Sequence, residues 1–181
     1  MARQHWVFGY GSLMWQPDFR YIERRGALLQ GWHRAHALAS TVAWGSTERP
    51  GLILTLVPGG SCLGTAFRVA PGYWRQTRAY LRQREAAYRQ IQIPLETARG
   101  KITALTFAAD PGHSRFIGKQ PLERSARMIA QGEGRKGTSR GYLAGTIAAV
   151  RAMGGQPEPE LQRLAAVVNT VVRGIGQPSI D

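Results

Sequence analysis

Residue types that support several common kinds of chemistry are scarce in this 181-residue sequence. Cys62 is the only cysteine, which excludes an internal disulfide and a zinc or iron–sulfur site built from several cysteines. The three aspartates are a thin supply for a catalytic triad, and the sequence around Ser12 lacks the Gly-x-Ser-x-Gly pattern of serine hydrolases. His33 and His36 form a pair with no third strong ligand nearby in sequence, so we expect no metal site.

Long apolar runs are also missing. No stretch approaches the roughly 20 apolar residues that span a bilayer, so we expect no integral membrane protein. The segment from Met1 to Trp6 lacks a basic region followed by an apolar one, and we expect no secretory signal. Together with the single cysteine, these absences predict a reduced, cytoplasmic protein.

Negative charge is scarce as well, since 24 basic residues stand against 11 acidic ones and give a formal net charge of +13. The basic residues are spread along the chain, and no block reaches about five or six like charges. Nucleic-acid binding is therefore not expected. The excess positive charge would instead attract a small anionic metabolite.

The length and the 43% apolar composition predict one domain over residues 1–181. Segments typical of strands are His5 to Tyr10, Leu28 to Leu38, Leu52 to Val57, Cys62 to Val69, Tyr88 to Ile93 and Lys101 to Ala108, with a turn at Pro58 to Gly60. Segments typical of helices are Trp74 to about Glu85, Pro121 to Ile129, Ser139 to Met153 and Glu158 to Arg173. Because strands mostly precede helices, this order favours an α+β fold over an alternating parallel sheet.

The first expected strand ends in a loop that contains two glycines, Gly9-Tyr10-Gly11-Ser12. Such glycines let backbone N–H groups approach an anion or a carbonyl oxygen closely. An ordinary turn produces the same pattern, and the third glycine of a dinucleotide-binding fingerprint is missing. The loop is therefore a candidate binding element, with a plain turn as the alternative.

Glu85 differs from the other glutamates in its position. It lies four residues after Leu81, on the face of the expected helix that carries apolar residues, and close to the helix C-terminus. Burial and the helix dipole would both raise the pKa of its carboxyl group towards that of a general base, while neighbouring Arg84 would oppose the rise. The alternative role for a glutamate at a helix end is a salt bridge.

Taken together, the two motifs resemble those of a known family. The segment from Trp6 to Trp15 is similar to the signature opening of the ChaC branch of gamma-glutamylcyclotransferases. Tyr80-Leu81-Arg82-Gln83-Arg84-Glu85 resembles the family's Tyr-Leu-x-x-Arg-Glu, whose glutamate is catalytic. The similarity continues through Arg34, Ser40-Thr41, Pro50-Gly51, Thr55-Leu56, Gly118, Pro121-Leu122-Glu123 and Tyr142-Leu143, and so covers Trp6 to about Val172.

The resemblance implies a small barrel-like mixed sheet flanked by helices. It also implies a cofactor-independent enzyme that cleaves glutathione to 5-oxoproline and cysteinylglycine. Glu85 would be the acid/base, and Tyr142 would supply a hydroxyl to the pocket. The substrate-binding residues would be Val7, Phe8, Gly9, Tyr10, Gly11, Ser12, Leu13 and Tyr142.

The chain departs from the family pattern at two places. The family commonly has Asp-His-Arg-Gly after Ser40-Thr41, where this chain has Val42-Ala43-Trp44-Gly45. After the glutamate the family has Lys-Gly-Gly-Tyr, and this chain has Ala86-Ala87-Tyr88. Two alternatives therefore stay open: cyclotransfer on other gamma-glutamyl amines or dipeptides, and a non-catalytic binding protein on the same scaffold. The sequence leaves the oligomeric state open.

Overall fold

The computed structural model describes residues 4–174 and residue 179. Residues 1–3 of the N-terminal segment considered above, and Asp181, lie outside the described residues. The chain forms two compact units, each made of two stretches. The first comprises Met1–Arg34 and Leu56–Asp110, and the second comprises Ala35–Thr55 and Pro111–Asp181. The single-domain organisation over residues 1–181 stays a prediction.

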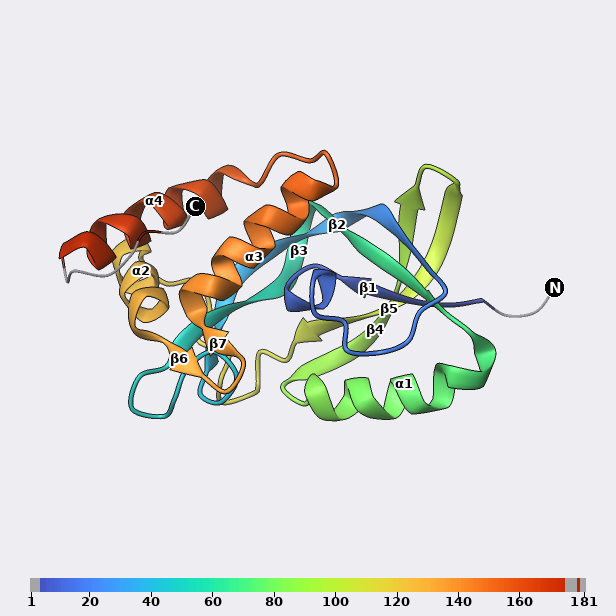
Figure 1. Ribbon diagram of the computed structural model, residues 1–181, viewed down its shortest axis with the longest axis horizontal. Coiled ribbons are helices and arrows are strands. Elements are labelled where there is room, and N and C mark those ends of the chain that lie inside the picture. The colour runs from blue at the N-terminus through green and yellow to red at the C-terminus, as the bar shows by residue number, and fades with distance from the viewer. Residues whose placement is uncertain (1–3, 175–178, 180–181) are drawn as a thin grey trace. The chain divides into compact units, whose positions relative to one another are not determined.

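Five strands build the main sheet: β1 (His5–Gly9), β2 (Glu23–Ser40), β3 (Gly51–Val69), β4 (Tyr88–Thr97) and β5 (Gly100–Ala109). They form a closed barrel in the order β1-β3-β2-β4-β5 (Figure 1). The sheet is mixed, because β1 runs antiparallel to β3 and parallel to β5. The expected barrel-like mixed sheet is confirmed.

The remaining described elements are mostly helical. They are the short 3-10 helix η1 (Ser12–Met14), α1 (Pro71–Arg84), α2 (Leu122–Gln131), the hairpin of β6 (Glu133–Gly134) and β7 (Gly137–Thr138), α3 (Ser139–Ala152) and α4 (Pro159–Gly174). The α+β class is confirmed. None of the helices described combines the length and apolarity needed to cross a membrane.

The core of the first unit lies between the barrel and α1. Val7 of β1 pairs with Phe67 of β3 on one side and with Leu105 of β5 on the other, and its side chain is fully buried. Leu81 of α1 packs into the same cluster, which also contains Val69 and the residues Leu13 and Phe107. Fully burying an aliphatic side chain contributes about 1.5–3 kcal/mol, so this cluster fixes the end of α1 against β1.

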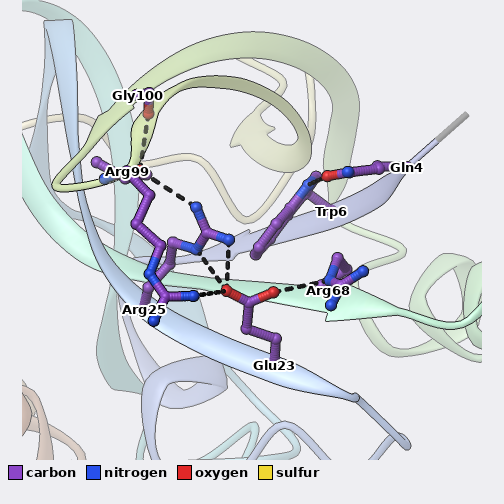
Figure 2. A network of polar contacts seen from close by, with 8 residues as sticks. Gln4, Trp6, Glu23, Arg25, Arg68, Arg99 and Gly100 are labelled. Atoms are coloured by element: carbon purple, nitrogen blue, oxygen red, sulfur yellow. Dashed lines mark hydrogen bonds and ion pairs between the residues drawn. The ribbon is translucent and has the colours of Figure 1, made fainter. Parts of the chain in front are cut away.

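A polar network in the first unit is centred on Glu23 of β2 (Figure 2). The carboxylate accepts hydrogen bonds from Arg25 Nε at 2.9 Å and Arg68 Nε at 2.8 Å, and Arg99 Nη1 lies 3.4 Å away. The Arg25 guanidinium also lies 4.5 Å from the centre of the Trp6 ring. Partial burial acts to raise the pKa of Glu23, but the hydrogen bonds and charges of Arg25 and Arg68 outweigh it and lower the pKa.

In the second unit, α2, α3 and α4 pack on one another. The start of α3 is held by two hydroxyl groups. Thr138 is the N-cap and accepts a hydrogen bond from the backbone N–H of Gly141 at 3.0 Å. Ser139, which the sequence predicted at the start of this helix, instead accepts from the backbone N–H of Leu52 at 3.0 Å. The serine therefore ties α3 to β3.

Two predicted strand ends, after Val57 and after Ile93, are wrong. Pro58 to Gly60 does not separate two strands, because β3 is continuous from Gly51 to Val69. Positive φ angles at Gly59 and Gly60 let the strand bend within its length without ending it. β4 likewise continues past Pro94, which pairs with Thr103 of β5. A proline is tolerated in a strand where the ladder does not need its missing N–H.

Candidate functional site

The glycine-containing loop begins where β1 ends, at Gly9. A Cβ atom on Gly9 would lie 2.7 Å from Leu13 Cβ, so only glycine allows the chain to turn back this closely. Leu13 and Met14 in η1 are buried and anchor the turn. The loop is therefore a tightly packed turn that presents the half-buried Ser12.

The other residues expected to bind substrate here are largely enclosed. Val7 and Phe8 have no exposed surface, and the Phe8 carbonyl accepts a hydrogen bond from Thr106 Oγ1 at 2.9 Å. The Tyr10 hydroxyl donates to the Phe107 carbonyl at 2.7 Å. The side chains of these residues hold β1 in the barrel. Ser12 differs from these residues because its side chain is only partly buried.

Arg84, the last residue of α1, joins the helix to this loop. Its Nη2 atom donates to Ser12 Oγ at 3.1 Å. Its Nη1 atom lies within hydrogen-bond distance of the Gln16 carbonyl (2.7 Å), the Pro17 carbonyl (3.3 Å), Asp18 Oδ2 (3.0 Å) and Tyr80 OH (3.0 Å). The Arg84 side chain is only 8% exposed. One guanidinium thus fixes residues 12 to 18 against the end of α1.

Glu85 occupies the C-cap position of α1, directly after Arg84. Its backbone N–H donates to the Leu81 carbonyl at 2.9 Å, and its carbonyl accepts from the Tyr88 N–H at 2.9 Å. The carboxylate Oε1 lies 3.1 Å from Arg84 Nε, and the side chain is 15% exposed. The predicted alternative of a salt bridge is therefore present. The same Arg84 group contacts both Glu85 and Ser12, which brings the two sequence motifs together.

Tyr80 lies one helical turn before Arg84 and adds a second hydroxyl at this junction. It donates to Asp18 Oδ2 at 3.3 Å. Burial raises the pKa of Tyr80, and Arg84 partly offsets that rise. The phenol therefore stays protonated at neutral pH and serves as a hydrogen-bond donor.

Tyr142 lies in the second unit, on α3. Its hydroxyl accepts a hydrogen bond from the backbone N–H of Leu54 at 3.3 Å, and the residue is 4% exposed. The ring of Trp44 packs edge-on against it, with the ring centres 5.3 Å apart. Trp44 belongs to the segment that departs from the family pattern, so one residue of that segment contacts Tyr142 directly.

The rest of that segment is held by its main chain. The carbonyls of Val42 and Ala43 accept from the N–H groups of Arg135 and Lys136 at 2.9 and 2.8 Å. The Trp44 N–H donates to Ser40 Oγ at 3.0 Å. Trp44 is buried, whereas the Val42 side chain is exposed. Trp44 therefore acts as part of the core of the second unit.

Within the described part of the chain, no group of three or more His, Cys, Asp or Glu residues is placed to hold a metal ion.

The contact of Arg84 with the loop is the part of the site that the sequence did not predict, because the sequence indicated only an effect of Arg84 on the pKa of Glu85. The signal was present in the motif, where Arg84 precedes Glu85 directly.

Comparison with known proteins gives consistent matches. The family model described as "ChaC-like protein" matches residues 5–171. The glutathione-specific gamma-glutamylcyclotransferase of Escherichia coli K12 is 34% identical over 142 residues, which are 76% of this chain and 62% of that protein. The mouse glutathione-specific gamma-glutamylcyclotransferase 1 is 32% identical over 174 residues, covering 92% of this chain and 77% of that protein. The chain thus spans slightly less than two thirds of the bacterial relative.

A solved structure from yeast, of a gamma-glutamyl cyclotransferase specific to glutathione, has the same fold. The TM-score is 0.87 at 22% identity, and the match covers 92% of this chain and 96% of that chain. The sequence matches and the shared fold together confirm the resemblance that the two motifs indicated.

Proposed function

Because this chain belongs to the ChaC-like protein family, we propose that it is a glutathione-specific gamma-glutamylcyclotransferase with Glu85 as its acid/base. The observation that carries the proposal is the junction at Arg84. There, Ser12 of the glycine-containing loop and the carboxylate of Glu85 contact one buried guanidinium.

The reaction needs no group beyond the substrate and a proton carrier. The α-amine nitrogen of glutathione attacks the γ-carbonyl carbon and forms the five-membered ring of 5-oxoproline. The amide bond to the cysteine nitrogen breaks, and cysteinylglycine leaves. Because nucleophile and carbonyl belong to one molecule, positioning supplies much of the rate, and effective molarities of about 10⁵–10⁸ M are known for well-oriented cases.

Glu85 is suited to move the proton. The attacking amine must lose a proton, and the departing amine must gain one, so a single carboxylate can accept the first and deliver the second. Glu85 is mostly buried, and the Arg84 contact restricts its orientation. Negative charge that develops on the γ-carbonyl oxygen would be stabilised by backbone N–H groups of the loop around Gly11 and Ser12.

A second candidate function is cyclotransfer on other gamma-glutamyl amines or dipeptides. The observation that favours it is Trp44, which is buried against Tyr142 where the family has a polar segment. If Tyr142 lines the pocket, this apolar neighbour would change how the part of the substrate beyond the γ-amide is held.

The proposed location of the protein is the cytoplasm, and its proposed partner is a small-molecule gamma-glutamyl peptide.

The test is release of 5-oxoproline and cysteinylglycine from glutathione by the purified protein, followed by mass spectrometry. We expect Glu85→Gln to bind glutathione and release nothing, while the exposed control Glu96→Gln on β4 keeps wild-type activity. Near-normal release by Glu85→Gln would overturn the assignment of the acid/base. Faster turnover of gamma-glutamyl-alanine than of glutathione would favour the second function. No turnover of either, with salt-dependent retention on RNA or DNA, would indicate the non-catalytic alternative.

A further inference from the structure

A cavity of about 580 Å³ opens on the first unit, away from the residues described above. Its size lies within the range of about 300–1,000 Å³ that is usual for small-molecule sites. Residues from the N-terminal segment, α1, β4 and β5 line it: Gln4, His5, Trp6, Trp74, Arg78, Gln92, Lys101, Ile102 and Thr103. None of them belongs to the proposed catalytic or substrate-binding set.

One wall of the cavity is a pair of stacked rings. His5 and Trp74 lie almost parallel, with an angle of 8° between their planes and 4.6 Å between their centres. The guanidinium of Arg78 lies 6.0 Å from the centre of the Trp74 ring. These contacts hold the indole in place before any ligand arrives. A flat aromatic ligand would extend this stack by lying against the outer face of the ring pair.

Trp6, another residue that lines the cavity, is also held in place by its neighbours. Trp6 is 3% exposed, and its indole N–H donates to Gln4 Oε1 at 3.1 Å (Figure 2). Arg25 covers the Trp6 ring and is itself paired with Glu23, as Figure 2 shows. A site whose walls are already ordered spends little free energy on rearrangement when a ligand binds.

The polar groups of the cavity favour an anion. Arg78 and Lys101 both line it, and among its described lining residues there is no aspartate or glutamate. Gln92 and Thr103 add neutral hydrogen-bonding groups that suit the edge of a heterocycle or a sugar hydroxyl. The net charge of +13 adds long-range attraction for a negatively charged ligand.

Glutathione does not explain this combination, because it has no aromatic ring to match the stacked wall. The cavity is also remote from Glu85 along the same helix. Trp74 lies 11 positions before Glu85, the C-cap of α1, which corresponds to about 16 Å at the rise of an α-helix. The two sites can therefore be occupied at the same time.

We propose that this cavity is a second ligand site, which binds a nucleoside phosphate with its base against the stacked His5–Trp74 pair and its phosphate at Arg78 and Lys101. The same chemistry is offered by free nucleotides and by the end of a single-stranded nucleic acid. The volume of about 580 Å³ suits a single nucleotide and therefore favours the free nucleotide.

Calorimetric titration of the whole protein tests the proposal, with AMP, ATP, adenosine and inorganic phosphate as separate probes. AMP and ATP should bind, and adenosine and phosphate should each bind at least about tenfold more weakly, because each makes only part of the contacts. Titration of an oligonucleotide of ten residues in the same way distinguishes the two sources. The free nucleotide should bind more tightly than the oligonucleotide.

Variants identify the site. The double variant Arg78→Gln/Lys101→Gln should weaken AMP binding by at least about tenfold and leave adenosine binding unchanged. Trp74→Leu should weaken both. The control Arg82→Gln removes a charge from the same helix, outside this cavity, and should change neither. Release of 5-oxoproline should persist in all of these variants, so loss of this site is distinguishable from failure of the proposed activity.

Two outcomes overturn the proposal: no binding of AMP, ATP or the oligonucleotide at millimolar concentration, or unchanged AMP binding by the double variant. Circular dichroism of each variant shows whether the protein is still folded. Trp74→Phe, which keeps an aromatic face, should restore much of the affinity that Trp74→Leu loses.

Discussion

The guanidinium of Arg84 and the hydroxyl of Ser12 lie 3.1 Å apart, although 72 positions of sequence separate them. This contact connects the loop that follows β1 to the helix that ends at Glu85. Loss of the guanidinium would remove the donor to two backbone carbonyls and one of the donors to Asp18 Oδ2, which also accepts from Tyr80. We therefore expect the geometry of the proposed site to depend on this one side chain.

Arg84→Ala should lower kcat/KM for glutathione by about 10–100-fold, since small displacements of reacting groups have effects of this size. Arg84→Lys keeps the charge but not the fork of donors, and we expect intermediate activity. Steady-state kinetics with thermal unfolding checks both. The exposed Arg82→Ala is the matched control, and equal activity of the two alanine variants would contradict a positioning role for Arg84.

Ser12→Ala removes the acceptor of the Arg84 bond and should reduce the free energy of unfolding by about 1 kcal/mol. The backbone of the loop is unchanged, so a reduced kcat with little change in KM is expected. Urea denaturation and initial-rate measurements give the two values. Wild-type stability together with wild-type kcat would show that this hydrogen bond is dispensable.

Gly9→Ala places a methyl group 2.7 Å from Leu13 Cβ, a separation that real Cβ atoms essentially never show. We expect a loss of about 1–3 kcal/mol of stability, as for other overpacked sites, and a displaced loop. The control is Gly72→Ala in the first turn of α1, where a methyl group meets nothing within 4 Å. There the substitution should be neutral or stabilising by up to about 1 kcal/mol. Thermal unfolding distinguishes the two.

Glu23→Gln should destabilise the protein at about pH 7 but have little effect once the pH is below the lowered folded-state pKa of Glu23. The pKa of Glu23 is lowered in the folded protein by Arg25 and Arg68, despite the opposing effect of burial. Its ionised form therefore stabilises the fold above the unfolded-state pKa, and this stabilisation disappears as the pH falls through the lower folded-state value. Unfolding of both proteins across this range gives the difference, and a constant difference at every pH would contradict the assignment.

Tyr142→Phe removes the hydroxyl that accepts from the Leu54 N–H, which should cost about 1 kcal/mol because one buried hydrogen bond is lost. If Tyr142 lines the substrate pocket as proposed, KM should also rise. Trp44→Phe alters the neighbouring ring without touching the hydroxyl and provides the comparison. A destabilised Tyr142→Phe with unchanged KM would restrict Tyr142 to a structural role.

The sequence predicted the local structure best where periodicity is strong. The expected helices at Ser139 to Met153 and Glu158 to Arg173 match α3 and α4 to within one residue at each end. Strand ends were harder, because Pro58-Gly59-Gly60 has the composition of a turn while cross-strand pairing keeps β3 continuous. Local patterns report backbone preference, and tertiary pairing overrides it here.

The candidate site was predictable only in part. Short motifs indicated Glu85 and the loop at Gly9 to Ser12, and the structure places Ser12 and Glu85 on one arginine. That Arg84 joins them was not predictable, because the contact depends on how α1 packs on the barrel. Nor could a motif show that the Tyr10 hydroxyl is already bonded to the Phe107 carbonyl.

The discontinuous make-up of the two units has a consequence for biosynthesis. All residues of the first unit, including Ser12, Arg84 and Glu85, have been synthesised once the ribosome reaches Asp110. The stretch Ala35–Thr55 is made early but belongs with segments that emerge last. A nascent chain therefore carries this stretch without its partners until α2, α3 and α4 are translated. A chain that stops after residue 110 would contain the proposed acid/base, but Leu38, Leu52 and Leu54 would lack the later segments of their unit, and we expect such a chain to be prone to aggregation.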